Sequence, residues 1–181
     1  MEKVRIKILL FINLLSLIGY YEFPPLYSLF AKGLNISPSF IGILWGYYTF
    51  VIALFVLIMG KIENRLPKKV VLVFGFLLYS LGSFAFLFVH NVESLILVFG
   101  LNALGAGFAL PAYKTLYSFN QDKGRESEEW SWVDSGNMFA ASIGSFIGGI
   151  VIGIYGFSGI FFTMGIIQGI AFLIAFIEFL L

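Results

Sequence analysis

Long apolar runs alternate with short polar connections along the whole chain. A helix needs about 20 apolar residues to cross a hydrocarbon core about 30 Å thick. The runs therefore predict six membrane-spanning helices, over Ile6–Phe30, Phe40–Gly60, Val70–Val89, Leu95–Ser118, Val133–Tyr155 and Ile160–Leu181. The strands of a β-barrel would instead alternate over about ten residues. The pattern predicts an all-α integral membrane protein with a single six-helix transmembrane domain over residues 1–181.

Basic residues concentrate in three polar segments: the N-terminal tail, the loop over residues 61–69 and the loop over residues 119–132. Lys and Arg favour the cytoplasmic side of a membrane. We therefore expect a multi-pass protein of the cell membrane with both loops and both termini in the cytoplasm. The second loop is interpreted as a solvated connector, with Trp130 and Trp132 anchoring the next helix at the interface.

The composition excludes several classes of protein. Hydrophobic residues make up 60% of the chain and charged residues 12%, whereas soluble domains carry about 25% charged residues. Lipid is thus the expected partner, and a net charge of +1 gives no field to attract nucleic acid. With no cysteine and a single histidine, His90, we expect no metal site. No phosphate-binding loop, Ser/His pair or paired intramembrane aspartates are present, so we expect no cofactor, no catalytic residues and no enzyme.

The connection between the second and third predicted helices carries a recognisable pattern. It contains Gly60, Asn64, Arg65, Lys68 and Lys69. This resembles the loop signature of the major facilitator superfamily, with asparagine where the family has aspartate. The resemblance implies a loop that takes part in the conformational change.

The fifth predicted helix carries glycines at a second set of family spacings, at Gly136, Gly144, Gly148 and Gly149. These resemble the family's fifth-helix signature. Glycines so spaced leave a helix face without side chains, which lets a neighbouring helix pack closely in lipid. We expect them to be helix-packing residues.

The resemblance spans nearly the whole chain and implies one N-terminal-type half of a twelve-helix transporter. A spacing in the first helix recurs 86 residues later, as an inverted three-plus-three repeat would give: Gly19, Pro25 and Tyr27, then Gly105, Pro111 and Tyr113. Because one half does not enclose a pathway, we expect a homodimer if this is the whole gene product. The alternative is half of a longer or split protein, which the absence of a basic tail after Leu181 slightly favours.

Polar residues inside the helices are the candidates for a substrate pathway. Helices 1 and 4 line the cavity in the family, so the preferred residues are Asn13, Tyr20, Glu22, Asn102 and Tyr113. The wider polar set adds Ser16, Tyr47, Tyr48, Thr49, Asn137 and Gln168. The alternative for each is an interhelical hydrogen bond.

Glu22 is also the candidate coupling group, because an ionisable residue inside a membrane helix is costly. Alternatively, it lies at the outer interface, in water or beside Lys32. Near the cytoplasmic side, Lys114 and Asp134 are interpreted as interfacial charges, with a gating ion pair as the alternative.

Together these features predict a secondary active transporter of a small organic solute, acting by alternating access and driven by a proton or ion gradient or by the solute gradient. The alternative is a membrane substrate-binding subunit of an ATP-driven uptake system.

Overall fold

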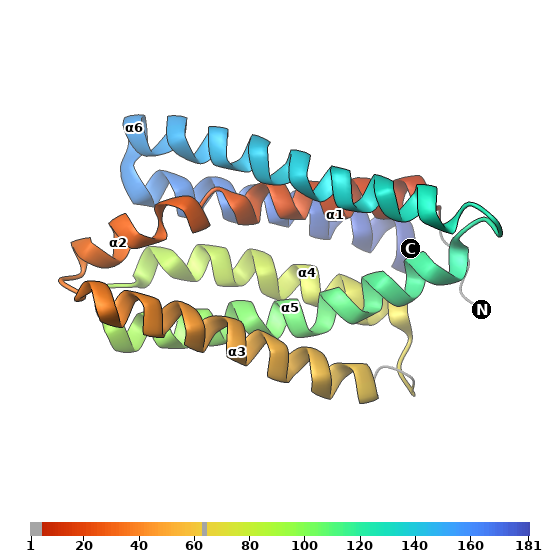
Figure 1. Cartoon of the computed structure of the whole chain (residues 1–181), viewed down its shortest axis with the longest axis horizontal. Coiled ribbons are helices and arrows are strands. Elements are labelled where there is room, and N and C mark those ends of the chain that lie inside the picture. Colours follow the sequence, from red (N-terminus) through yellow and green to blue (C-terminus); the bar gives the residue numbers. More distant parts are fainter. Residues whose placement is uncertain (1–4, 63–64) are drawn as a thin grey trace.

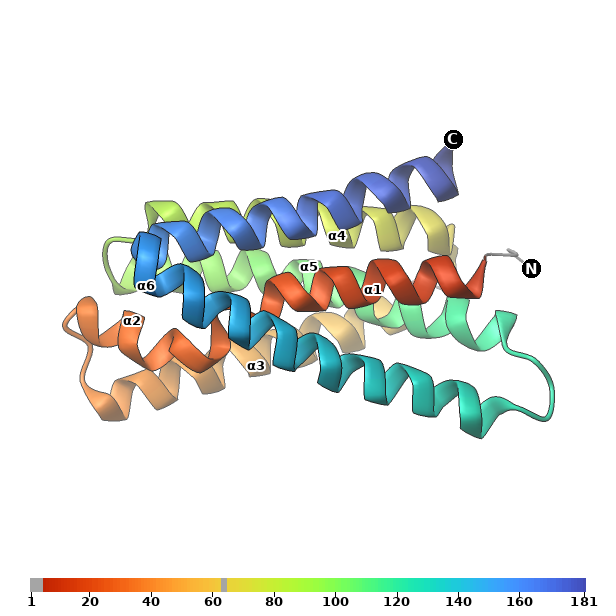
Figure 2. The ribbon, with the colours of Figure 1, turned by 90° about the horizontal axis from the view of Figure 1, so that it is seen from above.

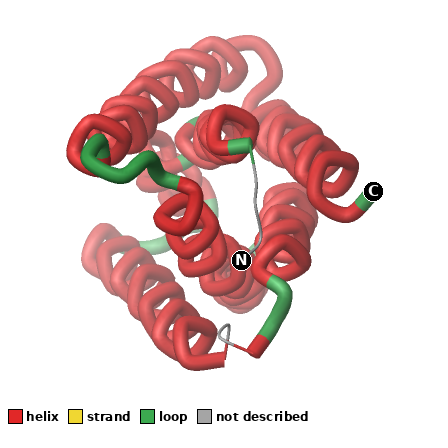
Figure 3. Tube along the Cα trace, turned by 90° about the vertical axis from the view of Figure 1, so that its right-hand side faces the viewer, coloured by secondary structure: helices red, strands yellow, loops and turns green. Residues whose placement is uncertain are grey.

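The computed structural model describes residues 5–62 and 65–181, and these residues form only helices and short connections. The elements are α1 (Ile6–Tyr21), η1 (Pro24–Leu26), α2 (Tyr27–Gly33), α3 (Pro38–Ile62), α4 (Lys68–Ala85), η3 (Phe86–Phe88), α5 (Val92–Asn120) and α6 (Glu126–Leu180). The long helices run along the longest axis of the molecule (Figure 1) and form a bundle in the end-on view (Figure 3).

The first apolar run is broken by two prolines. Pro24 and Pro25 have no N–H to bond the carbonyls of Tyr20 and Tyr21 one helical turn earlier. The α-helix α1 ends at Tyr21 and a 3₁₀ turn leads into the short α2, while Ile6–Gly33 as a whole is one candidate membrane span. The break places Glu22, the residue after α1, among packed helices.

The last helix, α6, reverses direction within its length. Its 55 residues would extend about 80 Å if straight, far beyond a bilayer core. At Gly156 the backbone leaves the helical region, with φ 65° and ψ −162°, and the chain turns back there (Figures 1 and 2). We call residues 126–155 the first arm and residues 157–180 the second arm.

Five helical stretches of the described chain are long and apolar enough to cross a membrane, with both arms of α6 counted as one. The sequence predicts that this helix begins at Val133, whereas the first arm begins at Glu126. The polar and charged residues 126–132 are helical as well.

Close helix packing places the first arm of α6 against α1. A Cβ added at Gly144 or Gly148 would collide with the backbone of Ile18 or Glu22, and one at Gly136 would approach a Leu14 methyl to 2.8 Å. Gly149 is exposed and has nothing within 4 Å of a Cβ position. Three of the four glycines therefore face α1, and the fourth faces away from it.

Two apolar clusters fill the bundle, one towards each end. The first joins Phe23 and Phe30, next to and within α2, to Phe161, and the second joins Leu9 of α1 to Leu72 of α4. In Figure 1, α2 and the start of α1 lie at opposite ends of the bundle.

Candidate functional site

A cavity of about 170 Å³ lies where the two apolar clusters meet. Four helices supply its wall: α1, α3, α4 and α5. Four of the lining residues are tyrosines, namely Tyr20, Tyr48, Tyr79 and Tyr113. The apolar part of the wall is Leu17, Ile52, Phe76, Ala106, Ala109 and Leu110. We call this space the tyrosine pocket.

The remaining wall is polar but uncharged. Asn13 and Ser16 line the pocket from α1, and no Asp, Glu, Lys, Arg or His is among the lining residues. The amide of Asn13 donates a hydrogen bond to Asn137 Oδ1 on α6 at 3.3 Å. Across the part of the chain that the structure describes, no three His, Asp or Glu side chains are placed to hold a metal ion.

Tyr113 is the lining residue that has a buried polar atom without a hydrogen-bond partner among the described residues. It is 5% exposed, and its hydroxyl is buried without a hydrogen bond to any described residue. One face of its ring stacks on Tyr117, with centroids 5.9 Å apart. The stacking holds the ring in place, and the hydroxyl is left without a hydrogen-bond partner that a bound molecule could supply.

A second cavity, of about 360 Å³, adjoins the tyrosine pocket. The two share Asn13, Leu17, Leu110 and Tyr113 as lining residues. The second cavity also contacts Lys114 and Asp134, for which the structure shows no mutual ion pair within 4 Å. We call it the charged vestibule.

The structure brings together three of the five preferred pathway residues. Asn13, Tyr20 and Tyr113 line the tyrosine pocket. Asn102 lies beside a cavity of about 10 Å³, where its amide donates to the Val98 carbonyl.

Glu22 lies outside the tyrosine pocket and is fully buried. Its Oε2 accepts a hydrogen bond from Thr163 Oγ1 on the second arm of α6, and its Oε1 has no partner among the described residues. No ion pair between Glu22 and Lys32 occurs, and Lys32 is exposed. Glu22 is therefore neither in water nor paired with Lys32, because its side chain is enclosed by the protein and hydrogen-bonded to Thr163.

Sequence reasoning missed Tyr79 and Phe76 on α4 as lining residues. A signal was present for Tyr79, because Tyr79, Ser80 and Ser83 are the polar positions of α4 after its first two lysines. Phe76 gave none, since a phenylalanine in a membrane helix is equally suited to lipid or to a cavity wall.

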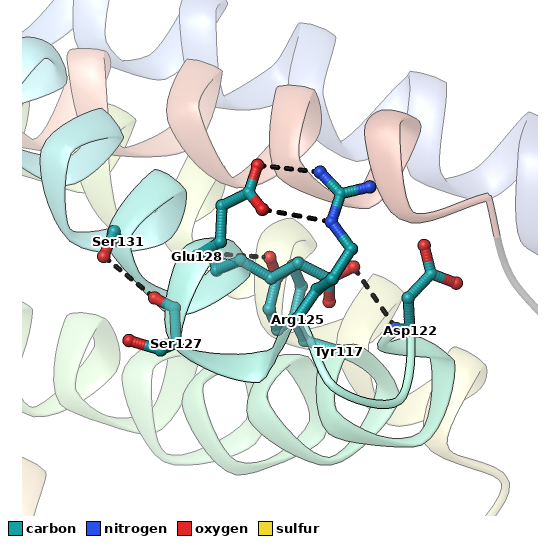
Figure 4. A network of polar contacts seen from close by, with 7 residues as sticks. Tyr117, Asp122, Arg125, Ser127, Glu128 and Ser131 are labelled. Atoms are coloured by element: carbon teal, nitrogen blue, oxygen red, sulfur yellow. Dashed lines mark hydrogen bonds and ion pairs between the residues drawn. The ribbon is translucent and has the colours of Figure 1, made fainter.

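The connection between α5 and α6 is held by a polar network, shown in Figure 4. Arg125 forms a two-pronged pair with Glu128, with N–O distances of 2.7 and 3.0 Å, and this pairing raises the pKa of Arg125. Tyr117 donates to the Glu129 carbonyl at 2.8 Å. These contacts join the last turns of α5 and the connection to the first turn of α6.

The basic segment between α3 and α4 lies at the same end of the bundle as the termini. Arg65 is exposed, and Lys68 donates to the Leu66 carbonyl at 3.4 Å. Gly60 is exposed in the last turn of α3, and Lys69 follows Lys68 in the first turn of α4. Asn64 lies outside the described residues.

Comparisons with known proteins agree with this architecture. A curated relative, an uncharacterised transporter of the major facilitator type from Methanocaldococcus jannaschii, is 22% identical over 163 residues, which are 90% of this chain and 42% of the relative. The crystal structure of the POT family transporter PepTSo superposes with a TM-score of 0.77 at 18% identity, over 95% of this chain and 36% of that one. The chain thus spans less than half the length of each.

The sequence model of the Major Facilitator Superfamily matches residues 9–181, which include all of the long helices described above except the first three residues of α1. The chain belongs to the major facilitator superfamily.

Proposed function

We propose that this chain is one half of a secondary transporter that moves a small organic solute across the cell membrane by alternating access. The observation that carries the proposal is the tyrosine pocket, an uncharged cavity built from four helices of a bundle of the superfamily's fold. Transporters of this kind hold the solute near the midplane, between two halves. Asn13, Tyr20 and Tyr113 are the pathway residues best placed to contact it, and Asn102 supports them from the adjoining cavity.

A second six-helix unit completes the transporter in this proposal. The chain covers 42% of its curated relative and 36% of the matched crystal structure, which leaves room for one further unit of similar size. The partner is a second copy, paired about an axis along the membrane normal, or a complementary half.

The two arms of α6 serve as separate membrane spans, which gives six crossings. The reversal at Gly156 supports this count, because a helix of 55 residues does not fit within one bilayer. Both termini and the basic connections lie at one end of the bundle (Figure 1), which we assign to the cytoplasm. The segment with Gly60, Arg65, Lys68 and Lys69 then acts as the cytoplasmic loop that changes contacts during transport.

Two equivalent glycine contacts support an inverted three-plus-three repeat. Gly19 of α1 packs against Met164 and Gln168 on the second arm of α6, and Gly105 of α5 packs against Gly75 and Tyr79 on α4. In the six-span order these are contacts of helix 1 with helix 6 and of helix 4 with helix 3. In an inverted three-plus-three repeat, helix 1 corresponds to helix 4 and helix 3 corresponds to helix 6, so the two contacts are equivalent.

Glu22 is the coupling group of this proposal. It is buried away from the described cations, and such a charge in lipid is costly unless it is neutralised by a proton or a cation. Its hydrogen bond with Thr163 joins the break after α1 to the second arm of α6. Gain and loss of a proton there would change how these two elements hold together.

Reconstitution of the purified full chain tests the proposal. We expect saturable counterflow of at least one radiolabelled member of a panel of neutral, anionic and cationic organic solutes. Chemical crosslinking in native membranes should trap a species of twice the chain's mass, or the chain with a complementary half. A strictly monomeric chain without counterflow of any solute would overturn the proposal, and an ATPase that co-purifies would support the substrate-binding subunit instead.

A further inference from the structure

The size of the tyrosine pocket limits what this half of the transporter can hold. Its volume is about 170 Å³, and a cavity of roughly 150 Å³ holds a benzene ring. The pocket therefore accommodates one six-membered ring, while a small substituent can extend along the wall that it shares with the charged vestibule.

The wall of the pocket favours an aromatic ring over an aliphatic one. Tyr20, Tyr48, Tyr79 and Phe76 contribute aromatic side chains from three helices. Aromatic pairs in offset or edge-to-face geometry gain free energy beyond simple burial. An aliphatic ring of equal size would gain the burial alone.

The absence of charge from the lining residues disfavours an ionised solute. A carboxylate or ammonium group that leaves water needs a counter-charge and further hydrogen bonds to recover its hydration energy. Lys114 and Asp134 are charged, but they line the adjoining charged vestibule and not the tyrosine pocket. In a homodimer, the second copy of the chain would contribute an identical set of lining residues, which are also uncharged.

The hydroxyl of Tyr113 supplies the specific polar contact. It is buried, without a partner among the described residues, and it lines the pocket. A buried donor without an acceptor is costly, so a solute that accepts its hydrogen bond removes that cost. A quaternary ammonium group would not do so, because it has no acceptor.

We propose that the tyrosine pocket selects uncharged solutes with a single aromatic ring and a hydrogen-bond acceptor, which the Tyr113 hydroxyl binds. The ring lies against the aromatic wall, and the acceptor faces Tyr113 at the boundary with the vestibule. The assignment rests on the proposed transport function, for which it names the class of solute.

Four probes of similar size separate the features of this proposal: benzamide, benzoate, benzylammonium and cyclohexanecarboxamide. Their affinity for the purified full chain is measured by calorimetry in detergent near neutral pH. We expect benzamide to bind at least tenfold more tightly than either charged probe, and severalfold more tightly than cyclohexanecarboxamide. Tighter binding of a charged probe, or no binding of benzamide, would overturn the proposal.

The variant Tyr113→Phe removes the hydroxyl and keeps the ring. We expect it to weaken benzamide binding about five- to tenfold, which corresponds to the free energy of one buried hydrogen bond. Binding of toluene, which has no acceptor, should not weaken. The matched control is Tyr155→Phe, because Tyr155 is 71% exposed and does not line the pocket. Equal loss for benzamide and toluene would show that Tyr113 acts only through packing.

Counterflow of radiolabelled benzamide in proteoliposomes separates this proposal from the one on which it rests. Selective binding without counterflow would reject transport and keep the assignment of the pocket. Counterflow of a charged solute with no binding of benzamide would keep transport and reject the assignment.

Discussion

At the scale of single residues, Glu22 and Thr163 form an unusual pair. The Thr163 hydroxyl has one proton, yet three acceptors lie within hydrogen-bond distance: Glu22 Oε2 and the carbonyls of Gly159 and Ile160. When Glu22 is protonated it can donate to Thr163, whose own proton then turns to a backbone carbonyl. When Glu22 is ionised, Thr163 donates to it. The pair therefore has a hydrogen-bonded arrangement for each protonation state.

Replacing the carboxyl by an amide should separate coupling from transport. Glu22→Gln keeps the shape and a hydrogen bond with Thr163 but cannot release a proton. We expect accumulation driven by a proton gradient to be lost and exchange of solute to persist, both measured as flux in proteoliposomes. Glu93→Gln is the control, because Glu93 is exposed in the first turn of α5. Unchanged accumulation in Glu22→Gln would reject the coupling role.

At the scale of elements, the contact between α1 and the first arm of α6 depends on the absence of side chains. Gly144 and Gly148 bring the first arm against the backbone of α1 and of the residue after it. Without a hydrophobic driving force between helices in lipid, such close packing is a main source of their association. The contact fixes the first arm beside Glu22.

Adjacent glycines give a matched test of this packing. Gly148→Ala places a methyl group against the Glu22 backbone, and such overpacking costs about 1–3 kcal/mol. Gly149→Ala meets nothing within 4 Å and should be neutral, or stabilising by up to about 1 kcal/mol, because alanine favours a helix. Thermal unfolding in detergent should show a lower midpoint for Gly148→Ala alone. Equal midpoints would contradict the packing role.

At the scale of the whole molecule, the proposed count of six membrane crossings depends on the reversal in α6. With two separate spans in α6, the turn at Gly156 faces the side opposite the connection between α5 and α6 (Figure 1). We propose that this opposite side faces the exterior, because basic residues, which favour the cytoplasm, gather at the other end of the bundle.

Cysteine labelling can test this topology without background, because the chain has no cysteine. Ser37, Lys123 and Ser158 are exposed positions in or near the turns. We expect Ser37→Cys and Ser158→Cys to react with a membrane-impermeant maleimide in intact cells, and Lys123→Cys to react only after permeabilisation. Protection of Ser158→Cys in intact cells, with Ser37→Cys labelled, would argue against two spans in α6.

The sequence by itself determined that this is a helical membrane protein of the major facilitator superfamily, because apolar run length and the spacing of glycines and charges are local properties of the chain. It also singled out Asn13, Tyr20 and Tyr113, which lie at the pocket because polar side chains in apolar helices avoid lipid.

Only the tertiary structure decided which polar residues share one space. Tyr79 joins the pocket from α4, Asn102 lies beside it, and Glu22 lies outside it against Thr163. These outcomes depend on helix rotation and on the proline break after α1. The break itself is local, because two prolines cause it. The rotation of each helix and the final position of Glu22 follow instead from how distant segments pack against one another, which residue spacing along one helix does not specify.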